Sequence, residues 1–224
     1  MKFTAARHSR MSVRDLKNLV KTGEGTYLEF KRTIPSPAKI AREIAALANT
    51  HGGTLLVGVD DDKSLFGVSS YHEQIFLFDQ AAYELCEPAL EYDLEILPYN
   101  YRDILIIRIK EAEKKPVTVK WGNKTVVFVR VKDKSVRASR EMVSILRHQA
   151  TGEGASFVYG PNEQKLFRYL TQYERITVRE FSNLIHVNRK IASNILVNLV
   201  NAGILEFFNT GKMDYFAMAH DVSV

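Results

Sequence analysis

Three charged residues near the N-terminus have the types and spacing of a phosphate-cleaving site. Glu29 and Lys31 are separated by one residue in the stretch "EGTYLEFKRT", and Glu24 precedes them by a glycine-containing bend. Because side chains alternate along a strand, Glu29 and Lys31 would share a face while Phe30 turns to the core. A carboxylate can hold a divalent cation while a neighbouring lysine contacts the scissile phosphate, as nucleases require.

Two further carboxylates, Asp60 and Asp61, follow the apolar stretch "TLLVGV", which we expect to form a buried strand beside the first one. With Glu24 and Glu29 they would supply enough oxygen ligands for one metal ion, with Asp60 as the third ligand. A glutamate and a lysine at this spacing also fit a surface ion pair, which is the interpretation favoured by the spacing alone. The residues by themselves leave both interpretations open.

The elements that would position these residues alternate between helices and strands. A helix is predicted after Ser12 and a second after Ser36 and Pro37, with Ile40, Ile44 and Leu47 on its apolar face. A helix at 71–86 follows, then strands in "LEYDLEILPY", "DILIIRIKEA", "PVTVKW" and "TVVFVRV", and a helix in "SREMVSILRHQ" capped by Ser139. This mixture predicts an α+β, or mixed α/β, domain over residues 1–150.

The remainder of the chain predicts a second, smaller domain. The Gly-rich stretch "ATGEGASFVYGPNE" resembles a linker, and helices are predicted in "NEQKLFRYLTQY", "TVREFSNLI" and "NRKIASNILVNLVNAG". Ile191, Ile195 and Leu199 would form the inner face of the third helix, and a hairpin turned at "NTGK" would follow it. Three helices and a hairpin predict a winged helix-turn-helix domain over residues 157–224.

Basic residues make an anionic partner plausible. The net charge is +5 and the isoelectric point is about 9.2. Besides a basic N-terminal segment from Arg7 to Lys21, the stretch "RVKDKSVRASR" at 130–140 concentrates cations that could contact phosphates. Its predicted nucleic-acid contacts are Arg130, Lys132, Lys134, Arg137 and Arg140.

The third helix of the C-terminal domain offers a second set of contacts. In a helix-turn-helix this helix enters the major groove, and its outward positions could reach phosphates and base edges. The predicted contacts are Arg189, Lys190, Ser193, Asn194 and, at the tip of the wing, Lys212. From Phe157 onward, however, seven basic residues face six acidic ones, so a module that contacts proteins or dimerises remains an alternative.

The combination of "EGTYLEFK", a capped helix ending "ALANTHGG", "TLLVGVDDD" and "VFVRVKDKSVRAS" resembles the Schlafen-type Alba-like domain over roughly residues 12–148. This resemblance implies an α/β domain that binds nucleic acid in a basic groove. In members with ribonuclease activity, three acidic residues act with a divalent metal. The matching positions are Glu24, Glu29 and either Asp60 or Asp61, and Mg²⁺ or Mn²⁺ would be the ion. Since such a groove is often built from two lobes, the resemblance also implies a homodimer.

Other function classes lack support in the sequence. Cys86 is the only cysteine, which suits a reducing compartment, and no phosphate-binding G-x-x-x-x-G-K-[ST] or zinc-type histidine spacing is present. Without a secretory signal or an apolar span, we expect a cytoplasmic protein with no membrane partner. The leading hypothesis is a DNA-binding transcriptional regulator, with DNA favoured over RNA. A metal-dependent endoribonuclease and an assembly protein that dimerises through the winged helix are the alternatives.

Overall fold

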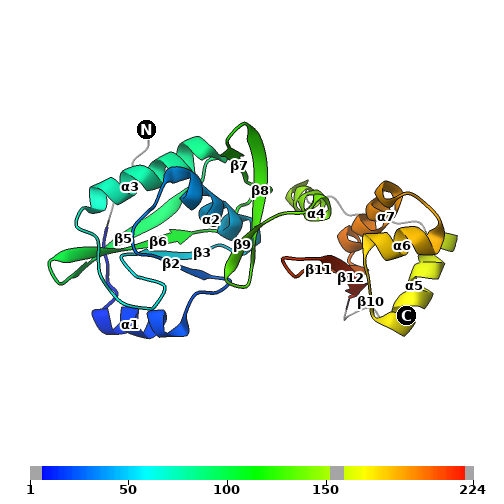
Figure 1. Ribbon diagram of the computed structural model, residues 1–224, viewed down its shortest axis with the longest axis horizontal. Helices are drawn as coiled ribbons and strands as arrows, with labels where there is room; N and C mark the ends of the chain where they lie inside the picture. The colour runs from blue at the N-terminus through cyan, green and yellow to red at the C-terminus, as the bar shows by residue number, and fades with distance from the viewer. Residues whose placement is uncertain (1–6, 152–158, 220–224) are drawn as a thin grey trace. The chain divides into compact units, whose positions relative to one another are not determined.

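The computed structural model describes residues 7–151 and 159–219 of the chain. The chain divides into two compact units, Met1–Ala138 and Ser139–Val224. Helices and strands are mixed in both units (Figure 1), which confirms the predicted α+β class. Half of the predicted linker, residues 152–158, lies outside the described part of the chain, and its two ends belong to the helices Arg140–Thr151 and Pro161–Tyr173. Every helix within the described ranges is too short or too polar to cross a lipid bilayer.

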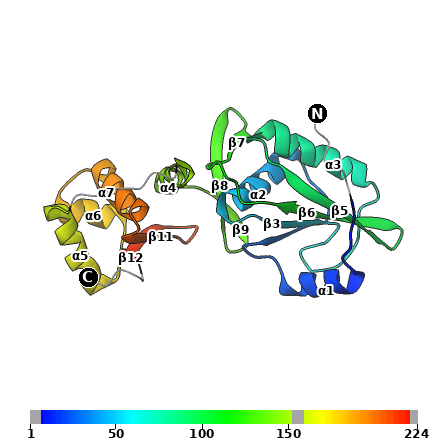
Figure 2. The ribbon, with the colours of Figure 1, turned by 180° about the vertical axis from the view of Figure 1, so that it is seen from behind.

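A five-stranded sheet in the order β1-β5-β6-β3-β2 runs through the first unit. Its strands are β1 (Arg7–His8), β2 (Leu28–Lys31), β3 (Gly53–Val57), β5 (Tyr92–Tyr99) and β6 (Arg102–Ile109). β2 pairs with β3, as predicted, and the pairing is parallel, whereas β3, β6 and β5 pair antiparallel. Helix α1 (Val13–Thr22) covers one face, and α2 (Pro37–Thr50) and α3 (Tyr71–Asp79) cover the other (Figures 1 and 2).

Alternation along the strands divides the apolar core between these two faces. Phe30 and Leu56 pack with Leu16 on the α1 side, while Leu55 packs with residues of α2 on the opposite side. Glu29 therefore points away from the α1 side, opposite to Phe30, as the sequence predicts. It is buried all the same, with 4% of its surface exposed.

Helix α2 lies between the main sheet and a second sheet, which explains why it is apolar on nearly all sides. Ser36 caps it by accepting from the backbone N–H of Lys39, as expected of serine before a helix. The second sheet has the order β4-β7-β8-β9. Its strands are β4 (Cys86–Glu87), β7 (Thr118–Trp121), β8 (Lys124–Val131) and β9 (Lys134–Arg137). Asn49 joins α2 to this sheet, because its amide donates to the carbonyls of Val117 and Phe128.

Several short elements differ from the prediction. Strands β1 and β9 were not expected, since two to four residues carry too little pattern to identify a strand. The helix predicted at 71–86 is α-helical only as far as Asp79. A π-helical segment over Gln80–Leu85 follows it directly. In the basic stretch 130–140, the predicted strand ends at Val131 as β8 does, and the structure adds a turn at Lys132 with φ of 57° and the strand β9.

In its described residues, 139–151 and 159–219, the second unit combines four helices with a small antiparallel sheet. Its elements are α4 (Arg140–Thr151), α5 (Pro161–Tyr173), β10 (Arg175–Ile176), α6 (Val178–Ile185), α7 (Arg189–Asn201), β11 (Leu205–Asn209) and β12 (Asp214–Met218). The sheet has the order β10-β12-β11. The fully buried Phe181 and Phe216 lie in the apolar core of the second unit. The sequence predicts α4 as part of the first domain, whereas its contacts assign it to the second unit.

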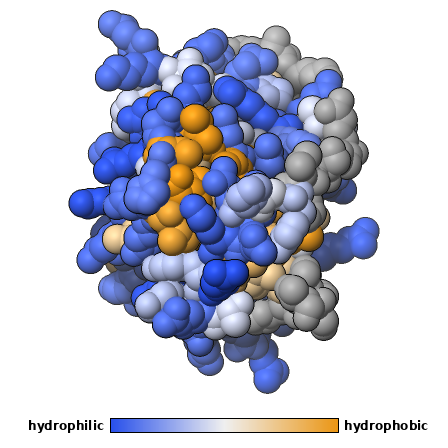
Figure 3. Space-filling model, turned by 90° about the vertical axis from the view of Figure 1, so that its right-hand side faces the viewer, coloured by the Kyte–Doolittle hydropathy of each residue, from blue (hydrophilic) through white to orange (hydrophobic). Residues whose placement is uncertain are grey.

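The inner face of α7 differs by one position from the prediction. Ala192, Leu196 and Leu199 are buried, whereas Ile191 is 46% exposed. The expectation that Ile191 faces the core is therefore wrong. On the side of the molecule shown in Figure 3, apolar side chains gather among polar ones. The half-buried or exposed apolar residues of α6, of α7 and of the turn between them include Leu184, Val187, Ile191 and Ile195.

Candidate nucleic-acid interface

Glu29 and Lys31 share one face of β2, but Glu29 is committed to contacts inside the first unit. One of its oxygens accepts from Lys31 Nζ, and the other accepts from Arg130 Nη2 at 2.5 Å. The guanidinium of Arg130 also donates to the carbonyl oxygens of Gly25, at 2.9 Å, and Leu28, at 3.3 Å. Because the Arg130 side chain is 0% exposed, this charge pair is shielded from solvent.

A second carboxylate, Glu43 of α2, completes the buried network. Its Oε2 lies 3.4 Å from Arg130 Nη1 and accepts from the Ser135 hydroxyl, and its Oε1 accepts from Arg42 Nη2 at 2.5 Å. The backbone N–H of Arg130 in turn donates to Thr50 Oγ1 at 2.9 Å. The network thus joins β2, α2, β8 and β9, and each buried charge has a partner, as burial requires.

Glu24 lies beside this network and is half-buried. Its Oε1 accepts from the backbone N–H of Phe30 at 2.8 Å and lies 4.0 Å from Lys31 Nζ. Burial raises the pKa of the Glu24 carboxyl, and the negative charges of Glu29 and Asp61 add to the rise, whereas the Phe30 N–H and Lys31 oppose it. A carboxylate tied to a backbone amide acts as a support for the bend before β2.

The remaining acids do not complete a metal site. Asp60 accepts from the backbone N–H of Asp61 at 2.9 Å and from Arg32 Nη1 at 3.3 Å, and Asp61 is exposed. Within residues 7–151 and 159–219, no group of three or more His, Cys, Asp or Glu side chains is placed to hold a metal ion. Both oxygens of Glu29 and of Asp60, and Oε1 of Glu24, accept from protein donors, so the predicted ligands Glu24, Glu29 and Asp60 are not arranged as a metal site in this structure.

The basic stretch 130–140 separates into buried and exposed residues. Arg130, predicted to contact nucleic acid, is inside the unit and cannot reach a phosphate. Lys132, Lys134 and Arg137 are exposed on the β8–β9 hairpin, and none has an ion pair to another residue of the described ranges. Arg140 is exposed as well, but it is the first residue of α4 and so belongs to the second unit.

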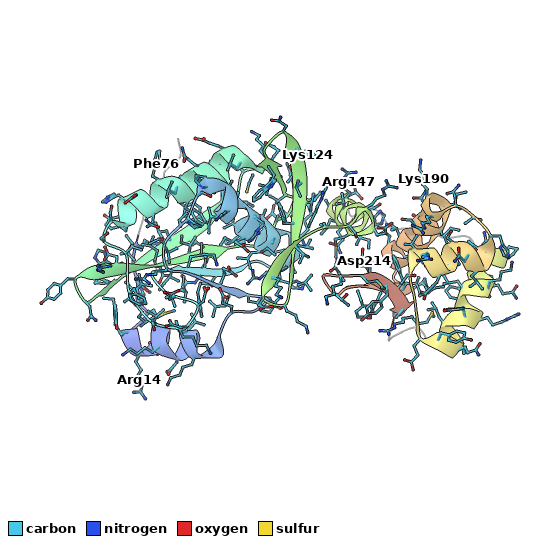
Figure 4. The ribbon with its side chains drawn as sticks, viewed as in Figure 1. Arg14, Phe76, Lys124, Arg147, Lys190 and Asp214 are labelled. Carbon is cyan, nitrogen blue, oxygen red and sulfur yellow. The ribbon has the colours of Figure 1, made fainter. Side chains whose placement is uncertain are left out.

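The second unit contains a basic cavity of about 410 Å³, which we call the helix-start cavity. It is lined by the first turns of α4, α6 and α7 and by the beginning of β12. The lining residues are Arg140, Glu141, Thr177, Val178, Arg179, Arg189, Lys190, Ser193 and Asp214. Figure 4 shows Lys190 extending outward from α7. None of the four basic residues forms an ion pair with another described residue.

Two carboxylates moderate the charge of the helix-start cavity. Glu141 accepts from the Ser193 hydroxyl at 2.6 Å, and Ser193 is buried, so this predicted contact residue is engaged inside the unit. Burial raises the pKa of Asp214, the charge of Glu141 adds to this rise, and a hydrogen bond from Ser139 opposes it. Four cations against two carboxylates leave the lining positive.

The other predicted residues of this unit remain on the surface. Asn194 lies exposed on α7, and Lys212 is exposed in the β11–β12 turn. The sequence prediction missed Arg179, Glu141 and Asp214. Arg179 could have been found from the capping box of Thr177 and Glu180, because that signal marks the helix start at which Arg179 lies.

Comparisons with known proteins identify one family. Residues 24–139 match the family described as Schlafen, AlbA_2. None of the curated proteins matches the sequence significantly. Among solved structures, the DIP2311 protein from Corynebacterium diphtheriae is 15% identical with a TM-score of 0.44, covering 87% of this chain and 34% of that one. The N-terminal domain of a RecG-related protein from Nitrosomonas europaea is 20% identical with a TM-score of 0.40, covering 58% of this chain and 93% of that one. The chain thus spans about a third of the length of the first of these structures.

Proposed function

The chain belongs to the Schlafen AlbA_2 family, and from this premise we propose that it is a nucleic-acid-binding protein that acts on DNA as a transcriptional regulator. The first unit would supply the exposed cations of the β8–β9 hairpin. The second unit would act as a winged helix-turn-helix, with α6 and α7 as the helix pair and the β11–β12 hairpin as the wing. In this arrangement α7 is the recognition helix.

The observation that carries the proposal is the placement of cations in the helix-start cavity. Arg140, Arg179, Arg189 and Lys190 all lie in the first turn of a helix. The helix dipole disfavours cations at this end by about 0.3–1 kcal/mol each. An anion bound between them would be attracted both by the side chains and by the helix ends. A DNA phosphate supplies such an anion. Phosphate binding therefore explains the position of these four cations, which the stability of the helices does not.

The buried network supports binding over metal-dependent cleavage. Glu29 is neutralised by Lys31 and Arg130, and Glu24 accepts from the Phe30 backbone N–H. Within the described residues, no group of three or more His, Cys, Asp or Glu side chains is placed to hold the metal ion that such cleavage needs. The proposal therefore gives them a structural role.

Replacing Arg189 and Lys190 together with glutamine tests the proposal in the full-length chain. The double variant should bind duplex DNA of any sequence more weakly, and the slope of log affinity against log salt should fall by about 1.8, or 0.9 for each lost phosphate contact. Fluorescence anisotropy over a salt series measures both. The matched control replaces Lys165 and Arg168 with glutamine. Both residues are exposed on α5 outside the cavity, so the slope should stay unchanged.

Sequence recognition is a separate part of the proposal. Asn194→Ala should reduce the preference for a selected DNA site more than it reduces affinity for random DNA, since an amide can pair with adenine but neutralises no phosphate. An unchanged preference would remove the recognition role of α7. Tighter binding to duplex RNA than to duplex DNA would show that RNA, and not DNA, is the target of the protein.

Self-association is the second candidate function, supported by the exposure of Ile191 on α7, while Leu184, Val187 and Ile195 pack against the core and stay partly exposed. Exposed apolar side chains that lie together often mark a protein contact. If this surface forms a homodimer, Ile191→Lys should shift the sedimentation coefficient from that of a dimer to that of a monomer. A wild-type protein that sediments as a monomer at high concentration would exclude this function.

A further inference from the structure

The turn between β5 and β6 is an unusual feature that the proposed function does not use. The two turn residues, Asn100 and Tyr101, have φ values of 47° and 61°. Tyr101 has a relative exposure of 110%, so its ring packs against nothing in the unit. Figures 1 and 2 both show this hairpin projecting beyond α1 and α3 at one end of the first unit.

Tyr101 is poorly suited to this conformation. A two-residue hairpin turn with positive φ at both positions favours Asn-Gly, because glycine has no Cβ to strain there. Asn100 follows that preference and Tyr101 does not. A bulky residue in the left-handed region is a genuine outlier, and such strain is typical of functional positions. Since the ring makes no packing contact within the unit, it is free to stack on a bound ligand.

A basic pocket lies beside the same hairpin, at Tyr99, the last residue of β5 before the turn. It has a volume of about 290 Å³ and is lined by Lys17, Val20, Lys21, Lys63, Leu65 and Tyr99. Tyr99 pairs across the hairpin with the exposed Arg102, immediately next to Tyr101. Lys63 reaches over the end of α1 and donates to the carbonyl of Lys21 at 3.0 Å. No ion pair within the described ranges neutralises any of the three lysines.

We propose that this hairpin tip and the lysine pocket bind single-stranded nucleic acid, with the Tyr101 ring stacked on a base and Lys17, Lys21 and Lys63 in contact with phosphates. Single strands are bound by aromatic side chains on which bases stack, next to cations that follow the backbone. Bases within a duplex are already stacked on one another, so an exposed ring gains most from an unpaired strand. The inference rests on the proposed nucleic-acid-binding function but uses a surface of the first unit, separate from the helix-start cavity.

Tyr101→Gly is the decisive variant because it restores the residue that the turn prefers. Its thermal unfolding temperature should equal or exceed that of the wild type. Its affinity for a fluorescein-labelled dT12 strand should nevertheless fall by about 5-fold to about 160-fold, the range expected for one lost base stack. Tyr101→Phe retains the ring and should bind dT12 within about twofold of wild type. Phe76→Ala, an exposed aromatic of α3 that is labelled in Figure 4, is the control and should change neither property.

A second variant tests the pocket independently. Lys17→Gln combined with Lys21→Gln should lower the salt slope for dT12 by about 1.4, or 0.7 for each phosphate contact to a single strand. The same variants should bind a blunt 20-base-pair duplex with little change.

The outcomes separate this inference from the proposed function. If Tyr101→Gly binds dT12 as tightly as wild type, the stacking role is overturned. A wild-type protein that binds duplex DNA through Arg189 and Lys190 but does not bind dT12 overturns the hairpin surface while the proposed function stands. A wild-type protein that binds neither nucleic acid refutes both.

Discussion

Arg130 in the first unit and Arg189 in the second are both predicted from the sequence to contact nucleic acid, yet they lie in opposite environments. The side chain of Arg130 is fully buried and donates to Glu29, Glu43 and two backbone carbonyls. Arg189 is exposed, lines the helix-start cavity and has no ion pair with any described residue. The same residue type thus has a structural role in one unit and is available for a ligand in the other.

The difference teaches that a basic cluster in a sequence combines two kinds of residue. A buried cation must be paired, and breaking that pair leaves an uncompensated charge in the interior. An exposed cation contributes little to stability and can form new contacts. Substitutions in the two regions should therefore separate stability from binding.

The largest effect is expected from Arg130→Met. Removal of the guanidinium leaves Glu29 and Glu43 buried without their shared partner, so the first unit should lose about 3–5 kcal/mol of stability. Urea denaturation measures this loss. Arg189→Met, the counterpart in the second unit, should change the free energy of unfolding by no more than about 0.5 kcal/mol. Similar losses of unfolding free energy in both variants would contradict the assignment of a structural role to Arg130 and a binding role to Arg189.

Glu29→Gln should have the next largest effect. The amide keeps the shape of the side chain but removes the charge that Lys31 and Arg130 contact, so we expect a loss of about 1–3 kcal/mol. Millimolar MgCl₂ should leave the melting temperatures of the wild type and of this variant unchanged. A stabilisation by Mg²⁺ that disappears in Glu29→Gln would instead show that Glu29 binds metal.

The exposed residues of the β8–β9 hairpin sharpen the contrast within a single stretch. Replacing Lys132, Lys134 and Arg137 with glutamine should leave stability within about 0.5 kcal/mol of wild type. Binding to duplex DNA should weaken, with the salt slope reduced by about 0.9 for each of the three residues that contacts a phosphate. Anisotropy in a salt series provides the measurement, and an unchanged slope would limit DNA contact to the second unit.

The smallest effect concerns Asp214 in the helix-start cavity. Because its pKa is raised in the folded state, the protein should lose stability as pH rises through that pKa and the half-buried carboxyl ionises. Asp214→Asn cannot ionise, so it should lose less stability than wild type between about pH 4 and about pH 7. Since a negative charge leaves the cavity, its affinity for DNA at neutral pH should rise slightly.

Denaturation at both pH values checks the stability difference. Asp133→Asn, an exchange at an exposed turn of the first unit, is the control and should follow the wild type. A variant whose stability falls with pH as steeply as that of the wild type would show that Asp214 is not the responsible group.

Local signals account for the parts of the fold that were predicted. Ser12 and Ser36 cap α1 and α2, and Thr177 and Glu180 form the capping box of α6, all through contacts between residues close in sequence. The two-residue period correctly placed Glu29 opposite to Phe30. Strands β1 and β10 were missed because each consists of two residues whose pairing partners lie far along the chain.

The sequence by itself determined the order of the helices and long strands, the positive charge and the acidic and basic residues from which any site must be built. Only the tertiary structure decided which of those charges are free. Arg130 meets Glu29 across 101 positions and Glu43 across 87, and Arg140, Arg179 and Arg189 gather from three helices. Burial and ion pairing depend on contacts between distant segments, and the periodicity of any one segment does not contain them.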